Sequence, residues 1–184
     1  MIICLGWGSL IWNPRSLPIS SNWRHDGPEL PIEFARQSSD GRITLVIEHS
    51  APELKVLSAD LNITDLTSAR NALADREGVS AKFMPRSIGY WSANEQSDHA
   101  EARAIGIWAE AGGHQGVVWT ALKPRFGNAF VTPTAEEVVA YLGTLSGEAR
   151  KNAEKYIRSA PKVVKTPYRS LIEDRLGWTH AIHQ

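Results

Sequence analysis

One carboxylate, that of Glu77, occupies a sequence position that suits acid–base chemistry. Leu66, Ala69 and Leu73 fall at i, i+3 and i+7 of a helix expected over residues 63–77, and they define its apolar stripe. Glu77 follows Leu73 by four residues, so its side chain continues this stripe toward the interior. Partial burial and the negative end of the helix dipole both make such a carboxylate a stronger base. General acid–base catalysis near neutral pH needs a base of this kind.

The same spacing leaves a structural role for Glu77 open. Its neighbours Asp75 and Arg76 are expected to point away from the apolar stripe. If the helix end frays, the Glu77 carboxylate lies in solvent or pairs with Arg76 or Lys82. Helix ends are the part of such a pattern that the sequence defines least, so spacing alone does not choose between the two roles.

The second candidate is the turn Gly6-Trp7-Gly8-Ser9-Leu10, which follows the apolar run of residues 1–5. Two glycines let the backbone turn tightly and approach a ligand closely. Consecutive N–H groups in such a turn can point into one concavity and hold a carboxylate, and Ser9 adds a hydroxyl donor. We therefore predict that Gly8 and Ser9 line a pocket. The alternative is a structural turn, and the spacing matches neither a nucleophile elbow nor a nucleotide-binding loop.

Metal and disulfide chemistry have little support in the sequence. Of the six histidines, only His180 and His183 have a ligand-like spacing, and no carboxylate or thiolate partner stands beside them. We therefore expect no metal site. The one cysteine, Cys4, lies in an apolar run, so no disulfide can form within the chain, which suits a reducing cytoplasm.

The composition is typical of a globular protein without a strongly charged partner. Its 184 residues fit a single domain over residues 1–184 with a full hydrophobic core. Twenty basic side chains balance twenty acidic ones, so neither nucleic acid nor an anionic membrane is an expected partner. Neither a signal peptide nor a membrane span is predicted, which favours a cytoplasmic protein.

Strand patterns come first along the chain and helix patterns come late. Thr134 and Glu137 form a capping box that predicts a helix to about Leu142, and a second helix is expected over residues 147–159 before Pro161. The tail from residue 162 shows mixed patterns. This order favours an α+β fold, with a curved mixed sheet or partly closed β-barrel and flanking helices. Strands are expected over residues 1–5, 32–34, 42–48, 55–62, 84–91, 102–110 and 116–122, the second and third as a hairpin.

Four short blocks, in order along most of the chain, resemble one enzyme family. Trp7-Gly8-Ser9-Leu10-Ile11-Trp12 resembles the Tyr-Gly-Ser-Leu-Ile-Trp motif of the γ-glutamylcyclotransferases, most closely of the ChaC-like branch that acts on glutathione. Ala74-Asp75-Arg76-Glu77-Gly78 is similar to the Asp-Tyr-Arg-Glu segment that carries the family's catalytic glutamate. The two supporting blocks comprise Phe34, Ser38, Asp40 and residues 41–45, and then Ser146, Gly147, Asn152, Glu154, Tyr156 and Ile157.

The resemblance implies a γ-glutamylcyclotransferase-like domain, a reaction and a set of site residues. In the family reaction, the α-amine of a γ-glutamyl group attacks its own γ-carbonyl and gives 5-oxoproline and a free amine, without a cofactor. Glu77 is then the catalytic acid and base, within reach of the pocket, and the partner is a small-molecule γ-glutamyl substrate. The substrate-binding residues that the resemblance implies are Trp7, Gly8, Ser9, Leu10, Ser38 and Tyr156, with the Tyr156 side chain facing inward.

Two departures from the family pattern concern the substrate. Trp7 stands where the motif has tyrosine, so a hydroxyl contact from that position is lost. The His-Arg-Gly-Thr-Pro insertion of the glutathione-acting branch is absent between Asp40 and Gly41, so the loop is shorter. Two alternatives stay open: a binding module without turnover, and an amidohydrolase or acyltransferase that acts on another γ-glutamyl amide. The presence of a glutamate at position 77 favours an enzyme.

Overall fold

The computed structural model describes residues 1–180, and the chain divides into two compact units. The single domain expected over residues 1–184 stays a prediction. Unit 1 comprises Met1–Gly6, Leu10–Leu30 and Lys55–Leu122. Unit 2 comprises, among the described residues, Trp7–Ser9, Pro31–Leu54 and residues 123–180.

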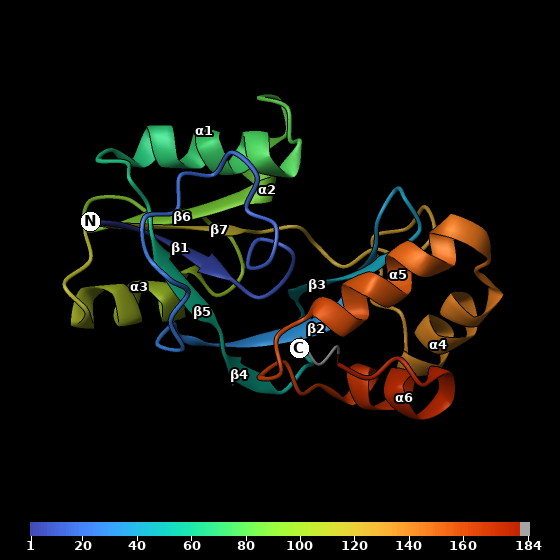
Figure 1. The fold of residues 1–184 in the computed structure, drawn as a ribbon. Coiled ribbons are helices and arrows are strands. Elements are labelled where there is room, and N and C mark those ends of the chain that lie inside the picture. The colour runs from blue at the N-terminus through green and yellow to red at the C-terminus, as the bar shows by residue number, and fades with distance from the viewer. Residues whose placement is uncertain (181–184) are drawn as a thin grey trace. The chain divides into compact units, whose positions relative to one another are not determined.

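Unit 1 is built on a four-stranded mixed sheet (Figure 1). The two central strands, β1 (Ile2–Gly6) and β7 (Gly116–Thr120), run parallel, and each pairs antiparallel with an outer strand. Cys4 of β1 lies opposite both Ala59 and Val118, at the centre of the sheet. In spatial order the strands are β5 (Leu57–Asp60), β1 (Ile2–Gly6), β7 (Gly116–Thr120) and β6 (Ile88–Ser92).

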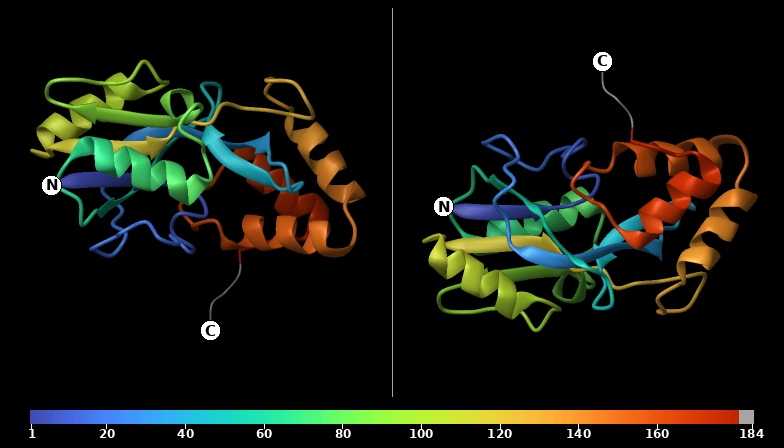
Figure 2. Two further views of the ribbon diagram at one scale, coloured as in Figure 1. Left: turned by 90° about the horizontal axis from the view of Figure 1, so that it is seen from above. Right: turned by 90° about the horizontal axis from the view of Figure 1, so that it is seen from below.

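Two helices cover opposite faces of this sheet, α1 (Leu66–Glu77) and α3 (Ala102–Ala111) (Figures 1 and 2). Strand side chains alternate between faces, so Cys4 and Val118 pack with Leu73 of α1 in one buried cluster. On the other face, Trp91 lies so close to Gly106 of α3 that an added Cβ atom would stand 2.7 Å from the indole nitrogen. The sheet therefore positions the helix that ends at Glu77.

Two of the expected strands are wrong in whole or part. Residues 102–110 form α3, because their buried positions recur at helical spacing: Ala102, Ile105, Gly106 and Ala109. Residues 84–87 form the short helix α2 (Met84–Ser87), with Pro85 in its first turn, where a missing N–H group costs nothing. The strand predicted over residues 84–91 is confirmed only from Ile88 onward.

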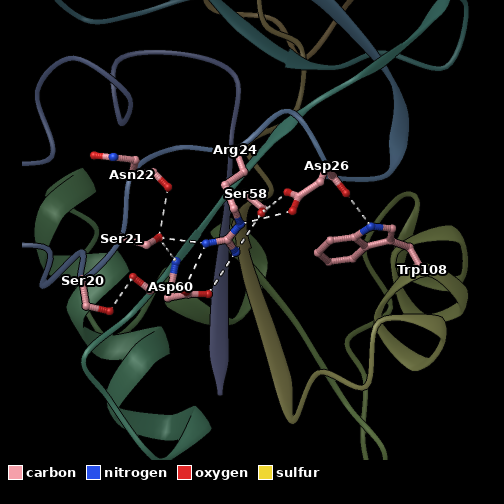
Figure 3. Close-up of polar contacts among 8 residues, drawn as sticks. All are labelled: Ser20, Ser21, Asn22, Arg24, Asp26, Ser58, Asp60 and Trp108. Atoms are coloured by element: carbon pink, nitrogen blue, oxygen red, sulfur yellow. Dashed lines mark hydrogen bonds and ion pairs between the residues drawn. The ribbon is translucent and has the colours of Figure 1, made fainter.

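A polar cluster fastens the loop after β1 to the edge strand β5 (Figure 3). Both terminal nitrogens of Arg24 donate to the Asp60 carboxylate at 3.0 Å. Asp26 accepts hydrogen bonds from Arg24 and from the Ser58 hydroxyl, and the Trp108 indole donates to the Asp26 carbonyl at 2.8 Å. A covered edge strand is protected from pairing with other chains, so the cluster has a structural explanation.

Unit 2 holds a second sheet, in the order β3 (Ile43–Ile47), β2 (Glu29–Gln37) and β4 (Glu53–Lys55). The predicted hairpin is confirmed, since β2 and β3 pair antiparallel around a turn in which Gly41 has φ +86°. The α+β class and the mixed sheet are also confirmed. Both sheets of residues 1–180 are open, so of the two predicted forms, a mixed sheet and a partly closed β-barrel, the structure has the mixed sheet.

Three helices complete unit 2. The capping box of Thr134 and Glu137 is confirmed and begins α4 (Ala135–Thr144), which ends two residues later than predicted. Helix α5 (Gly147–Ser159) has the predicted bounds and packs on β3. Helix α6 (Pro167–Leu176) packs on α4 and was missed in the mixed tail, although Thr166 and Pro167 are ordinary signals of a helix start.

The Glu33 carboxylate of β2 is buried, and hydrogen bonds to it connect the start of α6 with the sheet. It accepts hydrogen bonds from the Thr166 hydroxyl at 2.5 Å, the Phe34 N–H at 2.7 Å and the Tyr168 N–H at 3.3 Å. Burial raises the pKa of Glu33, and these three hydrogen bonds only partly oppose that effect. The folded state therefore holds the Glu33 proton more tightly than the unfolded state does.

Glu33→Gln is expected to change how stability depends on pH. Because the pKa is raised in the folded state, the wild type loses stability as the pH rises from 4.5, the ordinary value for this group, through the raised pKa. The variant has no such proton, so its unfolding free energy relative to wild type should rise over that range. Urea unfolding at several pH values measures this. Glu136→Gln, at an exposed position of α4, is the matched control. A relative stability that stays flat or falls contradicts the assignment.

Candidate active site

Glu77 is the last residue of α1, and its side chain is 17% exposed. Asp65 begins the helix, since its carboxylate accepts the Ser68 N–H at 2.8 Å. Gly78 ends it in the left-handed conformation, with φ +67°. Both helix ends are thus defined by local hydrogen bonds and backbone geometry, which places the Glu77 carboxylate on the largely buried side of α1.

The Glu77 carboxylate is held by a buried arginine. Arg76 is 5% exposed, and its Nη1 donates to Glu77 Oε1 at 2.6 Å. Its Nη2 donates to the Asn13 carbonyl at 2.6 Å, and Arg15 donates to the Arg76 carbonyl at 3.1 Å. Within residues 1–180, Glu77 Oε2 accepts no hydrogen bond, so this oxygen is available to a ligand.

The structure corrects the expectation that Arg76 points away from the apolar stripe. Arg76 follows Leu73 by three residues and Glu77 follows it by four, and both spacings lie on one helix face. The pairing of Glu77 with Arg76, one of the two possibilities that the sequence left open, is therefore present. A carboxylate with one oxygen fixed and the other available is compatible with proton transfer as well as with a structural role.

Cys4 lies in the same core as this ion pair and is chemically inert. Burial and, to a smaller extent, the negative charge of Glu77 raise the pKa of the Cys4 thiol to about 12, although the positive charge of Arg76 opposes both effects. The group therefore stays a neutral thiol near pH 7 and offers no thiolate nucleophile.

The predicted turn contributes residues to both units. Leu10 is buried in unit 1, in the cluster that contains Leu73. Trp7, Gly8 and Ser9 belong to unit 2, where Trp7 is 4% exposed. Glu77 belongs to unit 1, so its predicted proximity to Trp7–Ser9 of unit 2 stays a prediction.

Gly8 is required by a close contact and not by its backbone conformation. Its φ is not positive, yet a Cβ atom at this position would stand 2.6 Å from the hydroxyl oxygen of Tyr156. Tyr156, on α5, is 5% exposed, and its hydroxyl accepts the Leu45 N–H at 3.2 Å. The inward orientation expected of Tyr156 is present. Its contact with a substrate stays a prediction.

Ser38 lies in the shortened loop between β2 and β3. Its hydroxyl donates to Asp40 at 2.5 Å, and Asp40 pairs with Arg42 Nε at 2.7 Å. The Arg42 guanidinium lies 5.4 Å from the centre of the Tyr156 ring, in a cation–π contact. The Tyr141 hydroxyl donates to the Gly41 carbonyl at 2.8 Å. The loop is thus held in place next to Tyr156, and substrate binding by Ser38 stays a prediction.

These elements match a solved structure, the crystal structure of a γ-glutamyl cyclotransferase specific to glutathione from yeast. The alignment covers 97% of this chain and 99% of that chain, with a TM-score of 0.50 and 15% sequence identity. The chain shares the γ-glutamyl cyclotransferase fold. No family model and no curated protein matches the sequence.

Within this γ-glutamyl cyclotransferase fold, the sequence patterns indicated neither the contact of Arg42 with Tyr156, nor Tyr141, nor the buried position of Arg76. Arg42 lies in the run of residues 41–45 that resembles the family, so its positive charge was a signal for a polar contact near the site. Tyr141 gave none, because its partner Gly41 is far away in the sequence.

Across residues 1–180, no group of three or more His, Cys, Asp or Glu residues could hold a metal ion. Of the two histidines considered as ligands, His180 places Nδ1 3.0 Å from the Ala160 carbonyl, and His183 lies outside the described residues. None of the described helices is long and apolar enough to cross a bilayer.

Proposed function

We propose that the protein is a γ-glutamyl cyclotransferase, which converts a glutathione-like γ-glutamyl peptide or amide into 5-oxoproline and a free amine. The observation that carries the proposal is the Glu77 carboxylate, shielded from water, with one oxygen fixed by Arg76 and the other available to a ligand. The shared fold supports the proposal. The reaction needs no cofactor, because substrate and product have the same oxidation state.

The proposed reaction balances without water. The α-nitrogen of the γ-glutamyl group attacks the γ-carbonyl carbon, a C–N bond forms and closes the ring, and the original C–N amide bond breaks. Two protons leave the attacking ammonium and two reach the released amine, so no net proton is taken up. Glu77 carries these protons in turn, as general base and then as general acid.

The turn and Tyr156 are assigned to substrate binding. Backbone N–H groups of Gly8 and Ser9 would hold the α-carboxylate, and a folded substrate would bring the amine onto the carbonyl by proximity. The buried Tyr156 hydroxyl, which accepts the Leu45 N–H, is proposed to lie beside the bound γ-glutamyl group. Ser38, Trp7 and Leu10 are proposed to shape the pocket that surrounds the γ-glutamyl group.

A substrate panel tests the proposal. The protein is incubated with glutathione, γ-glutamylcysteine and several γ-glutamyl amines, and 5-oxoproline is measured by mass spectrometry. We expect 5-oxoproline and amine in equal amounts from at least one compound. Because the loop at Asp40 and Gly41 is short, glutathione need not be the best substrate. Binding without any product would instead indicate a binding module and would overturn the proposal.

A further inference from the structure

Two arginines of unit 2 lie side by side without an acidic partner. Arg36 of β2 forms a parallel bridge with Arg125. The Gln37 N–H donates to the Arg125 carbonyl at 2.7 Å, and the Arg125 N–H donates to the Ala35 carbonyl at 3.1 Å. Paired residues in such a bridge project their side chains from the same face of the sheet, so the two guanidinium groups share one face.

The guanidinium groups bind only backbone carbonyls within the described chain. Arg36 Nη1 donates to the Lys123 carbonyl at 2.7 Å, and Arg125 Nε donates to the Gly127 carbonyl at 3.1 Å. Neither arginine forms an ion pair among residues 1–180. Burial lowers the pKa of Arg36, and the positive charge of Arg125 lowers it further, which agrees with two close cations.

The segment that carries Arg125 is held by its neighbours. The Gly127 N–H donates to the Gln37 side chain at 2.8 Å, and Phe126 and Ala129 exchange two backbone hydrogen bonds. The Phe126 ring meets the Tyr141 ring edge-on, with the centroids 5.8 Å apart. Like charges directly opposite one another in a sheet are destabilising, so an anion bound to both guanidinium groups would stabilise this part of the fold.

We propose that Arg36 and Arg125 form an oxyanion site, which binds the phosphate or carboxylate group of a small molecule. A guanidinium presents a planar set of donors that matches two oxygens of either group, and most donors of both side chains remain available. The two partly buried positive charges are then neutralised by the ligand. This site does not depend on Glu77 or on the proposed cyclisation.

Thermal melting and calorimetric titration test the proposal, with sodium phosphate and, separately, glutathione as probes. Chloride at matched ionic strength is the control for screening. We expect one probe to raise the melting temperature of the wild type and of Arg103→Gln, which changes an exposed arginine of α3. Arg36→Gln and Arg125→Gln should each weaken binding about tenfold or more. Loss of phosphate binding assigns the site to phosphate, and loss of glutathione binding alone assigns it to a carboxylate.

Reversing the charge of Arg125 distinguishes an oxyanion site from a pair of arginines with only a structural role. Arg125→Glu places a carboxylate next to Arg36, so it should abolish probe binding and raise the melting temperature without ligand. Wild-type protein that binds neither probe overturns the proposal. Equal binding by wild type and both glutamine variants overturns it as well.

Discussion

Glu77→Gln is expected to lower the rate of 5-oxoproline formation by about 10²–10⁴-fold, the usual cost of removing a general acid–base group. Glutamine keeps the shape of the side chain and an oxygen that can accept the Arg76 hydrogen bond, so the fold and substrate binding should persist. It cannot accept or deliver a proton, so the loss should fall on kcat and not on KM. Initial rates for both proteins on the best substrate of the panel measure the effect.

Asp75→Asn is the matched control for this substitution. Asp75 lies two residues before Glu77 on α1 and is exposed. Its substitution by asparagine also removes one negative charge and one group that can accept a proton. We expect its rate to equal that of wild type, and melting curves check that both variants are folded. If Glu77→Gln turns over substrate at the wild-type rate, Glu77 does not transfer the proton and the proposed site is wrong.

Gly8→Ala is expected to destabilise the fold by about 1–3 kcal/mol, as an overpacked interior does, and to lower turnover. The new Cβ atom would meet the Tyr156 hydroxyl at 2.6 Å, closer than such atoms approach one another. Tyr156 is buried and hydrogen-bonded to Leu45, so it cannot move aside freely. Urea unfolding gives the stability, and the panel substrate gives the rate.

Tyr156→Phe turns this prediction into a double-mutant cycle. It removes the hydroxyl that the added methyl group meets, so Gly8→Ala should cost less in the Tyr156→Phe background than in wild type. Gly143→Ala, in α4, is the control, because its added Cβ atom meets nothing within 4 Å. Since alanine also favours a helix, that variant should be neutral or slightly more stable. Equal costs of Gly8→Ala in both backgrounds would contradict the contact.

The sequence predicted correctly those helices and turns that depend on residues close together in the chain. The capping box at Thr134 and Glu137 and the helix Gly147–Ser159 depend on neighbouring residues, and both are confirmed. The strand predicted over residues 102–110 is wrong, because a short apolar stretch satisfies the strand period as well as the helix period of α3. Helix α6 was missed although Thr166 and Pro167 mark its start.

The candidate site also combines features that follow from nearby residues with contacts between residues far apart in the sequence. The position of Glu77 on a largely buried helix face followed from its spacing to Leu73, and the structure bears that out. The contact of Tyr156 with Gly8 joins residues far apart in the sequence, so no local pattern could reveal it. The pairing of Arg36 with Arg125 was hidden for the same reason, since it depends on how the chain returns to β2.

The measurement that tests the central claim most directly is product analysis in water enriched in oxygen-18. Cyclisation uses the substrate's own amine, so wild-type protein should release 5-oxoproline without the label, together with an equal amount of amine. Glu77→Gln should release neither at a comparable rate. Glutamate that carries one labelled oxygen would mean that water attacks the γ-carbonyl. That result would make the protein an amidohydrolase and contradict the cyclotransferase account.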